Sequence, residues 1–185
     1  MGDVSDHGIP SALLMTTARA FLRQRMSRAG DLSHIVADVN RQLARDVEES
    51  GQFMTLFLCE IDVDHQSVRW VRAGHDPAII YDPEKDAFDE LGGRGLPLGV
   101  FDDSSYQIQS REIKAGQIIA IGTDGIWETT NTGGQQFGKA RFEAVIKTKA
   151  SKSAANILAG VINAVEGFAG QCEKSDDVTL VIMKV

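Results

Sequence analysis

Three aspartates lie in short segments, each next to an expected helix or strand, at widely separated positions of this 185-residue chain. Asp3 comes shortly before a helix, Asp124 directly follows a buried strand, and Asp176 directly precedes the last strand. Carboxylates placed on turns at the ends of rigid elements can form a cluster of hard oxygen ligands, which favours Mg²⁺ or Mn²⁺ over zinc. The first hypothesis is therefore a divalent-metal site.

Each of these aspartates also has a simpler interpretation. Gly-Asp and Asp-Gly pairs are common in turns, and aspartate often caps helices, so any one of them alone is a weak signal. The joint pattern is more specific. If the last strand pairs with the strand before Asp124, then Asp124 and Asp176 can approach one metal. Clustered carboxylates need cations to neutralise them, and two cations about 3.5–4 Å apart can activate a water in phosphatases.

Composition narrows the class of protein. Hydrophobic residues make up 43% and charged residues 24% of the chain, as in ordinary globular proteins. No apolar run approaches the ~20 residues that span a bilayer, and the first residues do not resemble a signal peptide, so we expect a cytoplasmic protein without a membrane segment. Two cysteines are too few for a disulfide framework. The net charge of −7 argues against nonspecific nucleic-acid binding.

The hydrophobic periodicity predicts the elements that must position these acids. Helices are expected over residues 9–28, 31–49, 126–130, 142–146 and 153–168, and strands over 53–61, 67–72, 78–81, 87–91, 106–113, 117–121 and 178–183. This order is not a regular βαβ alternation, so it favours an α+β fold in which helices cover an antiparallel sheet or sandwich. We see no internal repeat or linker and expect one domain over residues 1–185.

Six short motifs, spread over nearly the whole chain, occur in the order of a known family. They are Gly-Asp-Val at 2–4, Phe-Met-Thr at 53–55, Ala-Gly-His-Asp-Pro at 73–77, Leu-Pro-Leu-Gly at 96–99, Thr-Asp-Gly at 123–125 and Asp-Asp-Val-Thr at 176–179. With them the chain resembles the SpoIIE-like (RsbU-like) branch of the type-2C metal-dependent Ser/Thr protein phosphatases.

This resemblance implies an antiparallel β-sandwich flanked by helix pairs, and it assigns roles to the acids. Asp3, Asp124 and Asp176 would hold two Mn²⁺ or Mg²⁺ ions, with Asp3 as the bridge and the backbone carbonyl of Val4 as a further ligand. A metal-bound water would then attack phosphoserine or phosphothreonine directly, without a phosphoenzyme, so the three aspartates would be catalytic through that water. His7, at the start of the first helix, is a candidate general acid.

The resemblance also implies partners. Members of this branch commonly dephosphorylate small anti-sigma-antagonist proteins in bacterial partner-switching pathways, and they often carry sensor or receiver domains upstream. The expected partner is therefore such a phosphoprotein. The alternative is a phosphatase-like regulatory module that binds a partner without turnover.

Branch members usually have two strands before Gly-Asp-Val, with a Gly-Gly-Asp-x-x-Asp-like acidic motif that this chain lacks. We therefore expect an N-terminally truncated domain without its first strands, whose exposed sheet edge favours a homodimer.

Asp6 stands where the family tends to have glycine and is expected to cap the first helix. His75 is expected to bond backbone groups. For Arg19, Arg23 and Arg25, a solvated helix face is favoured over phosphate binding.

Overall fold

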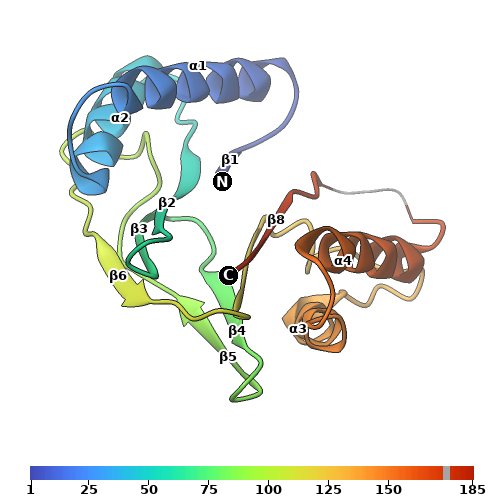
Figure 1. The fold of residues 1–185 in the computed structure, drawn as a ribbon. Coiled ribbons are helices and arrows are strands. Elements are labelled where there is room, and N and C mark those ends of the chain that lie inside the picture. Colours follow the sequence, from blue (N-terminus) through green and yellow to red (C-terminus); the bar gives the residue numbers. More distant parts are fainter. Residues whose placement is uncertain (173–175) are drawn as a thin grey trace. The chain divides into compact units, whose positions relative to one another are not determined.

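The computed structural model describes residues 1–172 and 176–185, and the chain divides into two compact units (Figure 1). Unit 1 consists of residues 1–77 and 92–112, and unit 2 of residues 78–91 and 113–185. Within the described residues, each unit holds one four-stranded antiparallel sheet and one pair of helices. The α+β class expected from the sequence is therefore confirmed.

The elements of unit 1 are β1 (Gly2–Val4), α1 (Ile9–Met26), α2 (Leu32–Val47), β2 (Met54–Asp62), β3 (Ser67–Ala73) and β6 (Gln109–Glu112), with the sheet order β1-β2-β3-β6. Those of unit 2 are β4 (Ala78–Asp82), β5 (Ala87–Leu91), β7 (Ile118–Gly122), α3 (Gly138–Thr148), α4 (Ala154–Ala169) and β8 (Leu180–Lys184), with the sheet order β5-β4-β7-β8.

The core of unit 1 lies between its helices and one face of its sheet. The side chain of Asp31 caps α2 by accepting a hydrogen bond from the His34 N–H. A stripe at helical spacing then faces the sheet: Leu32, Val36, Val39, Leu43 and Val47. Met54 and Leu56 of β2 contact this stripe. Side chains alternate along a strand, so Thr55, between them, points to the opposite face of the sheet.

The core of unit 2 lies between α3, α4 and the second sheet. All five residues of β7 are buried, and β7 pairs with β4 on one side and β8 on the other. Phe142 and Ile146 of α3 and Ile157 and Val161 of α4 cover this sheet. A central strand buried in this way has little freedom, so the residue that follows it is held firmly in place.

Most predicted elements are confirmed, and four differ. The helix predicted over 142–146 is longer, at 138–148. Residues 2–4 form a strand where a turn was expected, and the strand predicted over 106–113 is shorter, at 109–112. The predicted helix over 126–130 is wrong, because residues 124–127 form a turn and Thr130 forms an isolated bridge with Gln136. One helix-like bond forms, from the Glu128 N–H to the Asp124 carbonyl (2.8 Å). The carbonyls of Trp127 and Thr129, however, accept from the N–H groups of Gly138 (2.9 Å) and Phe137 (2.8 Å) and not from a following turn of helix.

Among the described residues, no helix combines the length and the apolar character that crossing a bilayer requires.

Candidate metal centre

Asp124 lies on a tight turn directly after β7. The turn is closed by backbone bonds from the Ile126 N–H to the Thr123 carbonyl (3.2 Å) and from the Glu128 N–H to the Asp124 carbonyl (2.8 Å). Because β7 is buried along its length and the turn is closed on itself, the backbone of Asp124 is well fixed.

The last strand brings the second acidic motif of unit 2 to this turn. β8 pairs with β7 in antiparallel register, with Gly122 opposite Leu180. The ladder continues past the strand end, since the Thr123 N–H donates to the Thr179 carbonyl (3.1 Å). A Cβ atom on Gly125 would lie 2.4 Å from the Asp177 carbonyl oxygen, so the two backbones touch. The pairing of these two strands, which is the condition for Asp124 and Asp176 to approach, is present.

The two carboxylates differ in their surroundings. Oδ1 of Asp124 is buried and makes no hydrogen bond within the described part of the chain. Asp176 is exposed, and its Oδ1 accepts a bond from the Asp177 N–H (2.7 Å). A buried carboxylate oxygen without a donor is costly, and a divalent cation is a group that would satisfy it. The donor chemistry at Asp124 thus fits a hard metal ion.

Asp3 belongs to unit 1 and sits on a strand, which corrects the turn expected there. β1 pairs with β2 so that Asp3 lies directly opposite Thr55. Opposite residues of an antiparallel pair share a face, so both side chains lie on the face away from α1 and α2. The Thr55 hydroxyl contacts Nδ1 of His75 at 2.8 Å, and His75 is only 3% exposed. Thr55 thus gives this imidazole a side-chain partner, whereas the sequence predicted bonds to backbone groups.

The segment between β1 and α1 holds the remaining candidates of unit 1. Val4 ends β1, and His7 is exposed in the bend that follows. Asp6 adopts a left-handed conformation (φ 64°), which explains a preference for glycine at this position. The expected capping role of Asp6 is wrong: the N-cap of α1 is Gly8, and no side chain caps the helix. Because the helix begins at Ile9, Asp6 lies two residues before the cap.

The structure thus brings the Asp124 and Asp176 motifs together in unit 2 and places Asp3, Val4 and His7 along one segment of unit 1. Over residues 1–172 and 176–185, no three His, Cys, Asp or Glu side chains form a ready metal-binding group. The metal-ligand roles stay predictions. Thr55 and Thr123 lie within the sequence motifs at 53–55 and 123–125, but no role was predicted for either threonine; their position inside motifs was the available signal.

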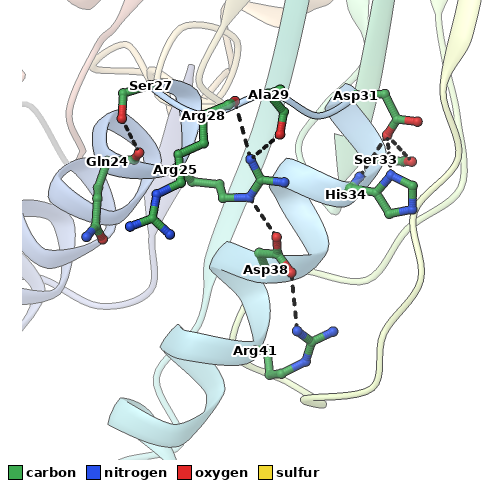
Figure 2. A network of polar contacts seen from close by, with 10 residues as sticks. All are labelled: Gln24, Arg25, Ser27, Arg28, Ala29, Asp31, Ser33, His34, Asp38 and Arg41. Atoms are coloured by element: carbon green, nitrogen blue, oxygen red, sulfur yellow. Dashed lines mark hydrogen bonds and ion pairs between the residues drawn. The ribbon is translucent and has the colours of Figure 1, made fainter.

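The arginines of α1 divide into two kinds, as Figure 2 shows for Arg25. Nε of Arg25 contacts Asp38 on α2 at 2.6 Å, and Arg41 contacts the same carboxylate at 3.2 Å. Hydrogen bonding to Arg25 lowers the pKa of the Asp38 carboxyl below its ordinary value. Arg19 and Arg23 are exposed, as expected of a solvated helix face. The solvated position expected for Arg25 is therefore wrong, because Arg25 links the two helices of unit 1 through Asp38.

Comparison with solved structures defines the class of the fold. The SiaA-PP2C domain of Pseudomonas aeruginosa matches all of this chain with a TM-score of 0.88 at 20% identity, and the match covers 74% of that chain. The PP2C phosphatase domain of SpoIIE from Bacillus subtilis also matches the whole chain, with a TM-score of 0.80 at 17% identity over 53% of that chain. The fold is that of the type-2C protein phosphatases.

The family follows from the sequence match. The family model of Stage II sporulation protein E (SpoIIE) matches residues 1–185, and the chain belongs to this family. Phosphoserine phosphatase RsbU of Bacillus subtilis is 27% identical over 134 residues, which are 72% of this chain and 40% of RsbU. Phosphoserine phosphatase RsbP of the same organism is 27% identical over 131 residues, 69% of this chain and 32% of RsbP. The chain thus spans less than half the length of these curated relatives.

Proposed function

We propose that this chain is a metal-dependent protein phosphatase domain of a bacterial signalling protein, which hydrolyses phosphoserine or phosphothreonine. The observation that carries the proposal is the buried, unpartnered Oδ1 of Asp124, on a turn held against the Asp176 motif. Membership of the SpoIIE family and the phosphoserine phosphatases among its relatives support the reaction type.

The proposed metal ligands are the carboxylates of Asp3, Asp124 and Asp176 and the backbone carbonyl of Val4, for Mn²⁺ or Mg²⁺. When bound, such cations lower the pKa of a coordinated water and offset charge on the phosphoryl oxygens. The contribution of the chain is to orient the proposed ligands. The turn after β7 holds Asp124, and the ladder to β2 holds Asp3. His7, exposed at the start of α1, is a proposed general acid for the leaving hydroxyl.

The proposed substrate is a small phosphoprotein of the anti-sigma-antagonist kind. The relatives RsbU and RsbP are named phosphoserine phosphatases, and a structure of the RsbU and RsbW domains of Rv1364c from Mycobacterium tuberculosis matches 99% of this chain with a TM-score of 0.79. An upstream sensor or receiver domain in the parent protein, a homodimer, and a cytoplasmic location belong to the same proposal.

Asp124→Asn gives the decisive test. We expect Mn²⁺-stimulated hydrolysis of a phosphoserine peptide to fall by about 100-fold or more, because cation stabilisation of this reaction is worth several kcal/mol. Without metal, the free energy of unfolding of this variant should equal or exceed that of the wild type, because the variant removes a buried carboxylate oxygen that has no hydrogen-bond partner. Asp64→Asn, at an exposed turn aspartate between β2 and β3, is the matched control and should leave both quantities unchanged.

Calorimetric titration with MnCl₂ separates this function from the alternative. Binding of Mn²⁺ that is weakened in Asp124→Asn supports the phosphatase. A wild-type chain that binds no Mn²⁺ and hydrolyses no phosphoserine peptide would overturn it and favour the phosphatase-like interaction module.

A further inference from the structure

Thr123, which directly precedes Asp124, is held by several hydrogen bonds to a neighbouring segment. Its side chain is buried, with the residue only 4% exposed, although a threonine at the end of a strand is often solvated. Its hydroxyl donates to the Asp177 carbonyl (3.0 Å) and accepts from the Thr179 N–H (3.1 Å). With the backbone bond from the Thr123 N–H to the Thr179 carbonyl, three hydrogen bonds join this one residue to the segment after Asp176.

The two bonds of the Thr123 hydroxyl satisfy backbone groups that the β7–β8 ladder leaves without a partner. β8 begins at Leu180, so the Asp177 carbonyl and the Thr179 N–H lie beyond the regular ladder between β7 and β8. A hydroxyl offers one donor and two acceptor sites, so a single side chain can serve both groups. Asp177 and Asp176 are neighbours in sequence, and Asp124 follows Thr123 directly. The Thr123 hydroxyl therefore connects the segments that carry the two acidic motifs.

We propose that Thr123 is a positioning residue of the phosphatase site, whose hydroxyl holds the Asp124 turn and the Asp176–Thr179 segment in register for metal binding. The inference rests on the proposed function for its metal, but the register itself is a property of the metal-free chain. Outer residues that orient metal ligands typically contribute 10- to 100-fold to metal affinity.

Thr123→Val removes the hydroxyl and keeps the branched shape, and Thr123→Ser restores the hydroxyl. We expect Thr123→Val to raise the Mn²⁺ dissociation constant about 10-fold or more by calorimetry, and Thr123→Ser to stay within about threefold of the wild type. Thr148→Val, which removes a hydroxyl bond to the Ala144 carbonyl within α3, is the matched control and should bind Mn²⁺ as the wild type does. Thr123→Ala replaces the valine variant if the latter does not fold.

Hydrogen exchange of the Thr179 amide gives a readout without metal or substrate. In metal-free Thr123→Val this amide loses its acceptor and should exchange about 10-fold faster or more, while Thr123→Ser protects it. Wild-type Mn²⁺ affinity in Thr123→Val would overturn the positioning role. A wild-type chain without Mn²⁺ binding would instead refute the proposed function, and the exchange rate would still report whether Thr123 sets the register.

Discussion

The two units each present an acidic motif beside a threonine, but they hold it by different means. In unit 2, Asp124 follows a fully buried central strand, and the Thr123 hydroxyl bonds two backbone groups of the neighbouring segment. In unit 1, Asp3 lies on a three-residue strand at the end of the described sheet, and the neighbouring Thr55 bonds the ring of His75.

This difference shows how local rigidity can be built in two ways. A carboxylate that follows a central strand is held by that rigid strand, so only the turn that carries it has to be fixed by further contacts. A carboxylate on a short terminal strand depends on one ladder and on the side chains beside it. We therefore expect substitutions near Asp124 to cost more stability than substitutions near Asp3. Two variants test this comparison, and a third tests the weaker link between the helices of unit 1, from the largest effect to the smallest.

Gly125→Ala should have the largest effect, confined to unit 2. Its new Cβ would lie 2.4 Å from the Asp177 carbonyl oxygen, a backbone atom that cannot move without separating the two motifs. We expect a loss of about 2–3 kcal/mol in the free energy of unfolding in urea. Hydrogen exchange should quicken in β7 and β8 more than in β2 and β3.

The control for that variant is Gly167→Ala in α4, where an added Cβ meets no atom within 4 Å. Alanine favours a helix interior over glycine by about 0.5–1 kcal/mol, so this variant should be slightly more stable than the wild type. If Gly125→Ala were as stable as the wild type, the close approach of Gly125 to the Asp177 carbonyl would not contribute to the stability of unit 2.

Thr55→Val should have an intermediate effect, confined to unit 1. Valine suits a strand at least as well as threonine, so the cost isolates the lost bond to Nδ1 of His75. We expect about 1–2 kcal/mol by chemical denaturation, because the buried imidazole nitrogen loses this partner. Thr55→Ser should recover most of it. A valine variant as stable as the serine variant would show that the bond to His75 contributes nothing.

Asp38→Asn should have the smallest effect, and the effect should depend on pH. The pKa of Asp38 is lowered in the folded state by Arg25, so the bond stabilises the fold above the ordinary carboxyl pKa of about 4 and is lost as the pH falls through the lower folded value. Because the carboxylate is 42% exposed and screened by water, we expect only about 0.3–1 kcal/mol at pH 7.

Urea unfolding at pH 7 and pH 3 checks this last prediction. The difference between Asp38→Asn and the wild type should shrink at the lower pH. Asp46→Asn, at an exposed position of the same helix, should show no such difference. A difference that grows toward pH 3 would contradict the assigned sign.

Much of this organisation could be predicted from the sequence because it depends on local signals. The stripe of α2 and its Asp31 cap predict a helix within two residues of the observed ends, and the continuous apolar run before Asp124 predicts a buried strand. The motifs, in family order, predict the SpoIIE family that the comparison confirms. These signals are read within short windows, where side-chain spacing alone determines the period.

Tertiary structure decided what depends on residues far apart in sequence. The stretch at residues 126–130 does not continue as a helix, and the carbonyls of Trp127 and Thr129 accept instead from the N–H groups of Gly138 and Phe137. Residues 2–4 become a strand because β2, some fifty residues later, offers them a partner. The registers of Thr123 with Thr179 and of Asp3 with Thr55 follow from strand pairing, which no local pattern encodes. The sequence by itself predicted which residues would carry the chemistry, and the fold decided which backbone and side-chain partners hold them, because hydrogen-bond pairing is settled only when distant segments meet.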